Sequence, residues 1–357
     1  MSDLFYLNAR LRAMRGRLLA WADYEKLLAS PGLSDIAVAL RETPYGAFLE
    51  SFRGDAAGVG KVDEALRWNF QATLSGLISL SGEETGEGIR LLLESWELQA
   101  IKAILRGKAA GLSAGEILET TVPTGLHEDA ALQELCRQPN VRAVVDLLTT
   151  WRDPWGNPLS RAMKEFREPR DLFVLETALD RFRTGRAAER LREIRRPGRG
   201  DETEDALSLF LALSVDRANL STALKALEDR IPAAECRRYY QPGGRIYGEK
   251  DFDRILSSKS VPEALGRAAR SFFARELKEV SSLSSAVPLL VAVELQLDRA
   301  LRRAMNSPIR RDPLGWGPLT GYLLDKSAEI RNVRMICRGR RAGITDSDLR
   351  GLLIFEE

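Results

Sequence analysis

Residues 97–111 read ELQAIKAILRGKAAG, and residues 329–343 read EIRNVRMICRGRRAG. The second stretch follows the first by 232 positions without a gap, and both place aliphatic residues at helical spacing ahead of a basic end and a glycine. A shorter copy, DRANLSTALK at residues 216–225, lies 113 positions before the last one. One helical motif therefore occurs three times in the chain.

Two other elements recur in the same order. Residues 176–181 (ETALDR) match residues 294–299 (ELQLDR) at a displacement of 118, and residues 63–66 (DEAL) are an eroded first copy. The other element is an aromatic residue followed by leucine four positions later. Its copies are Tyr45 with Leu49, Trp155 with Leu159, and Phe273 with Leu277.

Three elements at a period of about 115 residues indicate a triplicated chain. The period is much longer than that of a solenoid, so each copy is predicted to be a small helical subdomain. The predicted limits are 1–120, 121–235 and 236–357, with terminal helices free to pack across copies. Because alternating strand patterns are scarce, the fold class predicted is all-α.

The sequence also predicts helix faces and helix ends. Leu7 and Leu11 begin a leucine and methionine stripe on one face of an N-terminal helix, and arginines occupy much of the other faces. At the end of the last motif copy, Gly343 predicts a helix stop, and Thr345 with Asp348 predicts a capping box. Gly111 and Ser113 end the first copy in the same way.

Basic residues gather at the carboxyl ends of the repeated helix. Four of them, Arg106, Lys108, Arg338 and Arg340, are candidate partner-binding residues. The simpler explanation, which we weight more heavily, is that cations at a helix carboxyl end are favoured by about 0.3–1 kcal/mol. The binding hypothesis requires that similar helix ends be set around one axis.

Composition excludes several classes of protein. The 53 basic and 51 acidic residues nearly balance, which argues against a nucleic-acid-binding protein, and the basic run at residues 186–199 lacks the aromatic residues that stack on bases. Three widely spaced cysteines do not form a disulfide framework. The amino terminus is charged throughout, so we expect no signal peptide. No apolar run approaches the ~20 residues of a spanning helix, so we expect a soluble chain.

Catalytic and cofactor motifs fail on inspection. Residues 54–61 read GDAAGVGK, but Asp55 stands where a phosphate loop requires glycine, and Val62 replaces its serine or threonine. No direct nucleotide binding is therefore expected. The single histidine, His127, has no close cysteine or histidine, which argues against zinc and against an activated nucleophile. We predict no cofactor, no metal and no catalytic residue.

Taken together, the collinear motifs resemble one family. Besides the repeated motif, they are YLNARLRAM at residues 6–14, GGR at 243–245, DPLGWG at 312–317 followed by GYL at 321–323, and LLIF at 352–355. This set looks like the C subunit of V/A-type ATPases and ATP synthases, the family that includes the d subunit of the eukaryotic V-ATPase. The middle copy departs at Lys225-Ala226-Leu227, where Arg-Gly-Lys is lost, and the first has Ala100 in place of asparagine.

The resemblance implies a fold and a function. The fold is three pseudo-symmetric helical subdomains that form a funnel around a pseudo-threefold axis. The function is that of a non-catalytic central-stalk protein that joins the D- and F-type shaft subunits to the membrane proteolipid ring for rotation-coupled proton or sodium transport. Such a protein lies peripherally on the cytoplasmic face of the cell membrane. A generic helical scaffold, an enzyme and an RNA-binding repeat protein are the alternatives.

Overall fold

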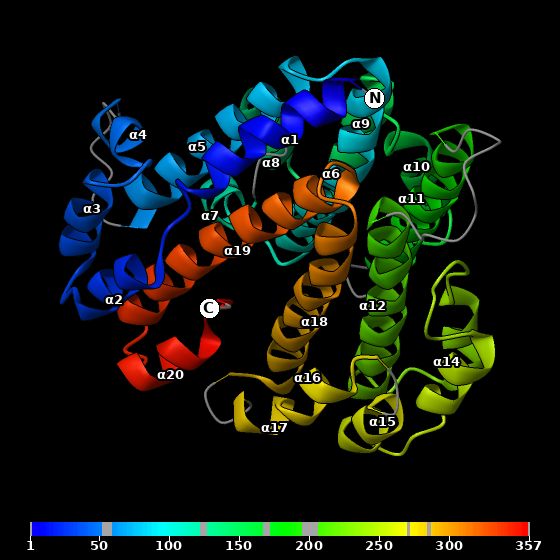
Figure 1. Cartoon of the computed structure of the whole chain (residues 1–357). Helices are drawn as coiled ribbons and strands as arrows, with labels where there is room; N and C mark the ends of the chain where they lie inside the picture. Colours follow the sequence, from blue (N-terminus) through cyan, green and yellow to red (C-terminus); the bar gives the residue numbers. More distant parts are fainter. Residues whose placement is uncertain are drawn as a thin grey trace. The chain divides into compact units, whose positions relative to one another are not determined.

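The computed structural model of the chain describes residues 2–51, 59–121, 127–166, 172–194, 206–269, 272–283 and 287–355 (Figure 1). Within these ranges the regular elements are all helical and no strand occurs, which confirms the all-α prediction. Residues 54–58 of the glycine-rich stretch and residues 195–199 of the basic run lie outside the described residues.

The chain divides into two compact units. Unit 1 comprises Met1–Ala65 and Gly200–Glu357, and unit 2 comprises Leu66–Arg199. Unit 1 contains α1 (Ser2–Arg15), α2 (Trp21–Ala29), α3 (Leu33–Arg41), α4 (Gly46–Ser51), the start of α5 (Val59–Ser79), α12 (Ala206–Glu228), α13 (Ala233–Cys236), a 3-10 turn (Arg237–Tyr239), α14 (Glu249–Leu256), α15 (Val261–Ala268), α16 (Ala274–Lys278), α17 (Val280–Leu283), α18 (Leu289–Arg311), α19 (Trp316–Arg341) and α20 (Asp346–Leu352). Unit 2 contains the rest of α5 with α6 (Glu83–Ala109), α7 (Ala114–Thr120), α8 (Asp129–Arg137), α9 (Val141–Thr150), α10 (Gly156–Ala162) and α11 (Leu172–Ile194).

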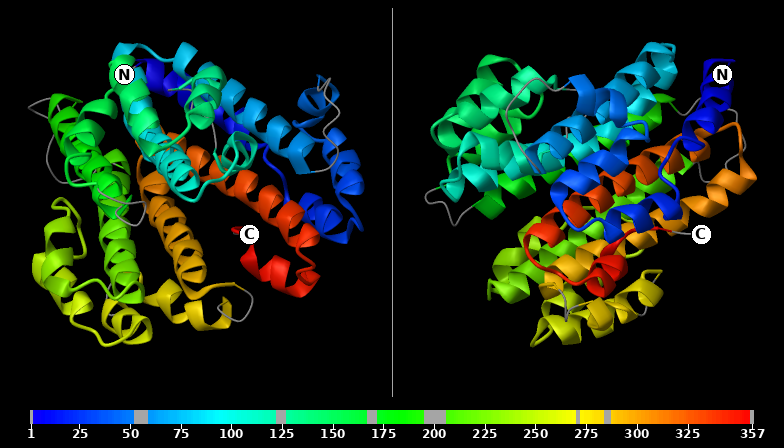
Figure 2. Two further views of the ribbon diagram at one scale, coloured as in Figure 1. Left: turned by 180° about the vertical axis from the view of Figure 1, so that it is seen from behind. Right: turned by 90° about the vertical axis from the view of Figure 1, so that its left-hand side faces the viewer.

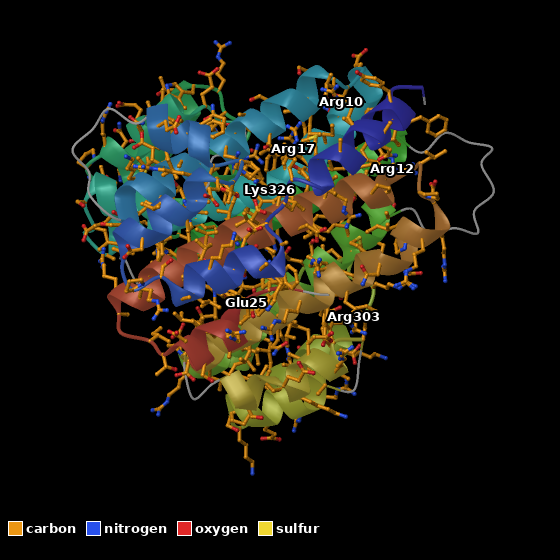
Figure 3. The ribbon with its side chains drawn as sticks, turned by 60° about the vertical axis from the view of Figure 1, so that its left-hand side comes forward. Arg10, Arg12, Arg17, Glu25, Arg303 and Lys326 are labelled. Carbon is orange, nitrogen blue, oxygen red and sulfur yellow. The ribbon has the colours of Figure 1, made fainter. Side chains whose placement is uncertain are left out.

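The long helices of unit 1 pack on one another through apolar faces. Helix α18 contacts both α12 and α19, and the short helices α14 to α17 gather at one end of α12 and α18 (Figure 2). On α1, Leu7 and Leu11 are buried as the spacing predicts, while Arg10 and Arg12 are exposed (Figure 3). In unit 2, α6 packs against α11, and Trp155 and Phe182 meet edge to face in the core that these helices share with α8, α9 and α10.

The motif copies form α6, α12 and α19, and these helices end alike. Gly111, Gly343 and Arg230 follow them with positive φ of 73°, 72° and 57°. In each case the next residue's N–H donates to the carbonyl five positions back, at 2.9, 2.9 and 2.8 Å. This pattern satisfies carbonyls that a helix end leaves without partners. The stops at both glycines are confirmed, as are the caps at Ser113 and Thr345. The limits of the three copies stay a prediction.

In the last turn of α6 and of α19, a glycine allows a close crossing with the helix that follows. A Cβ on Gly107 of α6 would lie 2.4 Å from Ile117 of α7, and a Cβ on Gly339 of α19 would lie 2.2 Å from Leu349 of α20. Glycine is therefore required wherever a branched side chain fills the opposite position.

In the middle copy the helix residue is larger and the opposite residue is smaller, and this difference provides a test. Ala226 and Cys236, both buried, stand where the last copy has Gly339 and Leu349. Gly339→Ala alone should lower the free energy of unfolding by about 1–3 kcal/mol, because the added methyl overpacks the crossing. Adding Leu349→Cys, to copy the middle pair, should recover part of that loss. Urea unfolding of the two single variants and the double variant measures the coupling. Additive effects would contradict the packing explanation.

Candidate functional site

Each motif copy opens with a buried carboxylate. Glu97, Asp216 and Glu329 occupy the first motif position, and only 5%, 0% and 2% of each residue is exposed. A carboxylate removed from water is costly unless charged or N–H and O–H partners replace the water. In all three cases such partners come from the copy that follows in cyclic order, when copies are counted by their predicted limits. Lys326, which lies in the same copy as Glu329, is an additional partner.

In unit 2, Glu97 is held by a histidine and a tryptophan. Nδ1 of His127 lies 2.5 Å from Oε1 of Glu97, and Nε1 of Trp155 donates to Oε2 at 3.1 Å. The other ring nitrogen of His127 lies 2.8 Å from Oδ2 of Asp153. Burial by itself lowers the pKa of His127, but the hydrogen bonds and charges of Asp153 and Glu97 raise this pKa to about 10. His127 is therefore a cation between two carboxylates.

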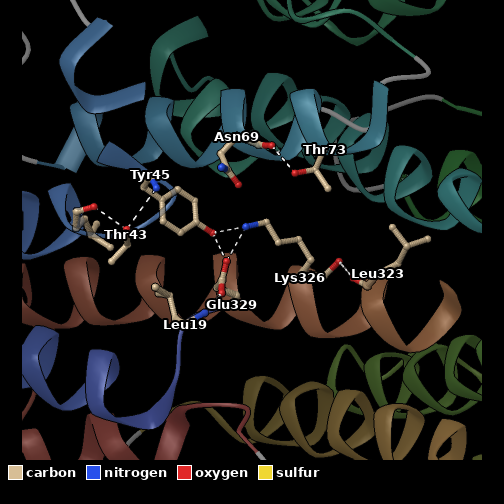
Figure 4. Close-up of polar contacts among 10 residues, drawn as sticks. Leu19, Thr43, Tyr45, Asn69, Thr73, Leu323, Lys326 and Glu329 are labelled. Carbon is tan, nitrogen blue, oxygen red and sulfur yellow. Dashed lines mark hydrogen bonds and ion pairs between the residues drawn. The ribbon is translucent and has the colours of Figure 1, made fainter. Parts of the chain in front are cut away.

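In unit 1, Glu329 is held by three different donors (Figure 4). The Tyr45 hydroxyl donates to Oε1 at 2.5 Å, Nζ of Lys326 donates to the same oxygen at 2.6 Å, and the Leu19 N–H donates to Oε2 at 2.5 Å. Burial, and then the negative charge of Glu329, raise the pKa of Tyr45, so its hydroxyl keeps the proton that it donates. Burial lowers the pKa of Lys326, whereas Glu329 opposes this shift.

Asp216 of unit 1 uses backbone donors alone. The N–H groups of Arg245, Ile246 and Tyr247 donate to its two oxygens at 2.8, 3.0 and 2.9 Å. Burial raises the pKa of Asp216, and these three hydrogen bonds work in the opposite direction. A Cβ on Gly244 would lie 2.3 Å from Oδ1 of Asp216, so the second glycine of the GGR motif lets the backbone wrap the carboxylate.

The aromatic element supplies a donor in two of the three copies. Tyr45 and Trp155 each bond to a buried carboxylate through O–H or N–H. Phe273 has no donor, and its ring packs 6.1 Å from that of Tyr247, whose backbone N–H serves Asp216. The copies therefore stabilise the same kind of buried carboxylate with different chemical groups.

The asparagine of the motif fixes the segment that follows the next helix. Asn332 exchanges two hydrogen bonds with the backbone of Ile354, both at 2.8 Å, and Asn219 does the same with Gln241 at 2.8 and 2.9 Å. Each pair is separated by 22 residues. The first copy carries Ala100, whose side chain has no polar group to form this pair of hydrogen bonds.

Ion pairs also join the basic helix ends to the acidic residue that opens the second element. In each pair the cation belongs to one copy and the acid to the next, and the last copy pairs with the first. The pairs are Arg106 with Glu176 at 2.5 Å, Lys225 with Glu294 at 3.4 Å, and Arg338 with Asp63 at 3.8 Å. In each of these pairs the cation is partly exposed to solvent, which weakens the attraction.

No metal site is found in the described part of the chain, where no cluster of three or more histidine, cysteine, aspartate or glutamate side chains has suitable geometry. The described helices are also too short or too polar to cross a membrane.

The comparison with known families decides the assignment. The family model described as "ATP synthase (C/AC39) subunit" matches residues 7–352. The chain belongs to this family. Relatives named as the C subunit of an A-type ATP synthase include proteins from Methanocaldococcus jannaschii (25% identical), Halorubrum lacusprofundi (26%) and Methanococcoides burtonii (26%). The alignments cover 98%, 98% and 99% of this chain and 86%, 97% and 94% of those proteins.

Membership in the C/AC39 family confirms the resemblance read from the repeated motif. The family comprises structural subunits, in agreement with the prediction that the chain is not an enzyme. His127, considered only as a metal ligand or base from the sequence, instead holds a buried carboxylate, a role that its isolated position in the sequence does not indicate.

The four candidate partner-binding residues have mixed surroundings. Arg106 and Arg338 have 44% of their side chains exposed and form the ion pairs described above. Arg340 lies 2.5 Å from Asp346 and also donates to the backbone carbonyl of Leu28. Lys108 is half-buried. These contacts show a structural use for three of the four, and a role in partner binding stays a prediction.

The His127 cluster predicts a dependence of stability on pH. Its pKa is raised from 6.5 to about 10 in the folded protein, so protonated His127 favours folding. The contribution is fully present below pH 6.5 and is lost as pH rises towards 10. The difference in unfolding free energy between wild type and His127→Gln should therefore shrink across that window in urea titrations. A difference that stays constant with pH would contradict the ion-paired state.

Proposed function

We propose that the chain is the central-stalk coupling component of an A-type ATP synthase, which joins the rotor shaft to the membrane proteolipid ring. The observation that carries the proposal is the family match over residues 7–352, together with relatives of similar length that are named as the C subunit of such a complex. In this role the chain carries no reaction of its own and transmits rotation between ion flow and ATP turnover. The proposed location is peripheral, on the cytoplasmic face of the membrane.

The contacts between copies favour a connector that resists deformation. Torque passes through a body without loss only if its parts do not slide over one another. Each buried carboxylate fixes the next copy through two or three directional bonds, which break if the helices shift by an ångström or two. The cyclic order of the pairs, in which the last copy bonds to the first, supports the proposed funnel about a pseudo-threefold axis.

The proposed partners require two interfaces. D- and F-type shaft subunits would enter the mouth of the funnel, and the proteolipid ring would contact its other side. Stable complexes bury about 1,600 Å² per interface, so several side chains must take part on each face. The candidate contacts remain Arg106, Lys108, Arg338 and Arg340. An arginine that already holds one carboxylate still has N–H donors for another.

Co-purification tests the proposal directly. The tagged chain should be recovered from detergent-solubilised membranes with the shaft subunits and the proteolipid, and deleting its gene should uncouple ATP hydrolysis from ion transport. A generic helical scaffold would be recovered without these subunits and would leave coupling intact, which is the outcome that contradicts the proposal.

Charge reversal tests the candidate residues separately. Arg338→Glu with Arg340→Glu should weaken recovery of the shaft or the ring at least tenfold in a pull-down, if these side chains contact a partner. Arg254→Glu, at an exposed arginine that pairs with Asp251 within its own helix, is the matched control. If the pair of changes lowers thermal stability alone and partner recovery is unaltered, the basic ends serve only their own helices.

A further inference from the structure

The first helix of the chain exposes an unusual combination of side chains. One side of α1 packs on α19, and the opposite side faces solvent. Near its start, Phe5 and Tyr6 are 46% and 53% exposed. Arg10 and Arg12 are exposed further along the same helix, and Arg17 is exposed in the turn that follows it (Figure 3). Together these five side chains form what we call the α1 face.

The positive charge of the α1 face is not balanced by its own chain. No aspartate or glutamate occurs from residue 4 to residue 22. Its three arginines form no ion pair with any described residue. Several exposed arginines of other helices are instead paired with an acid three or four residues away, namely Arg90 with Glu87, Arg137 with Glu134, Arg254 with Asp251, and Arg275 with Glu279. The α1 face therefore differs from an ordinary solvated helix surface, where charges of both signs alternate.

The turn between α18 and α19 adds to this end of unit 1. Nδ2 of Asn8 donates to the carbonyl of Gly315 at 3.0 Å, which places the turn beside the first half of α1. Leu314 in the turn is 43% exposed. Arg310 and Arg311, at the end of α18, are exposed and also lack an ion pair among the described residues. Apolar and cationic side chains are thus exposed together at this end.

This combination fits an anionic lipid surface. Aromatic side chains are favoured at the headgroup level of a bilayer, and arginines on the adjoining surface are attracted to anionic lipids. Each basic residue near such a surface strengthens binding about fivefold. The location proposed above favours lipid over an acidic protein as the partner, because the cytoplasmic leaflet of a membrane is negatively charged.

We propose that the α1 face binds anionic phospholipid headgroups at the surface of a bilayer. Its arginines contact the phosphates, for which a guanidinium has a matching fork of donors, and Phe5 and Tyr6 lie among the headgroups. The choice of lipid rests on the proposed membrane location. Lipid binding is nevertheless measured on the purified chain without other subunits, so this proposal and the coupling role can fail separately.

Vesicle co-sedimentation of the full chain is the test. Vesicles of phosphatidylcholine with phosphatidylglycerol should bind the chain at least tenfold more tightly than vesicles of phosphatidylcholine alone, and added salt should reduce the difference. Changing Arg10, Arg12 and Arg17 together to glutamine should weaken binding to the anionic vesicles tenfold or more. Phe5→Ala with Tyr6→Ala should also weaken it, because the rings no longer enter the headgroup region.

A matched control separates the α1 face from charge in general. Arg137→Gln with Arg254→Gln and Arg275→Gln removes the same number of exposed cations, each of which has an acid on its own helix, and should leave vesicle binding unchanged. Thermal unfolding verifies that every variant is folded.

Three results would overturn the proposal. They are equal binding to both kinds of vesicle, a folded arginine variant of the α1 face that binds like wild type, and an equal loss of binding in the control variant. If the chain ignores vesicles but binds polyglutamate through the arginines of the α1 face, its partner is an acidic protein instead. A chain that ignores vesicles yet is recovered with the proteolipid would keep the coupling role and lose only the lipid contact.

Discussion

Three buried carboxylates at the first position of a repeated helical motif constrain the rest of this structure. An ionised carboxylate excluded from water must receive several hydrogen-bond donors or a cation, and a helix offers none from its own backbone at its middle. Glu97, Asp216 and Glu329 therefore require a second segment against the helix at a defined place. The repeated motif therefore specifies contacts between copies as well as an apolar face of the helix.

The chemistry of the donors differs while their position is kept. A histidine cation with a tryptophan, a lysine with a tyrosine, and three consecutive backbone amides serve the three carboxylates. The backbone solution needs glycine beside Asp216, which explains the GGR motif, and it leaves Phe273 free to be purely apolar. The residues around Asp216 thus differ together from those of the other copies, and Ala226 and Cys236 likewise differ together from Gly339 and Leu349.

The sequence contained enough information for the helices, their ends and the family, because these depend on local pattern. Gly111, Gly343, Ser113 and Thr345 act within a few residues, so their effects are readable without the fold. The helix end at Arg230 was missed because arginine carries no signal for positive φ. What could not be predicted was contact between copies: the Tyr45 hydroxyl and Glu329 are 284 residues apart, and nothing local ties them.

The same comparison between copies separates two kinds of polar residue. A polar residue that recurs in every copy is explained by the fold that the copies share, as Arg106, Lys225 and Arg338 are by their ion pairs with the next copy. A buried polar residue present in one copy alone needs a partner of its own, as His127 has in Glu97 and Asp153, and costs stability where it has none. Gln296 is of the second kind, since its equivalent is Ala178 and its amide oxygen has no partner among the described residues. In a triplicated protein, the repeated motif is therefore accounted for by the contacts that hold the copies together, and a buried polar residue that is not repeated needs a separate explanation.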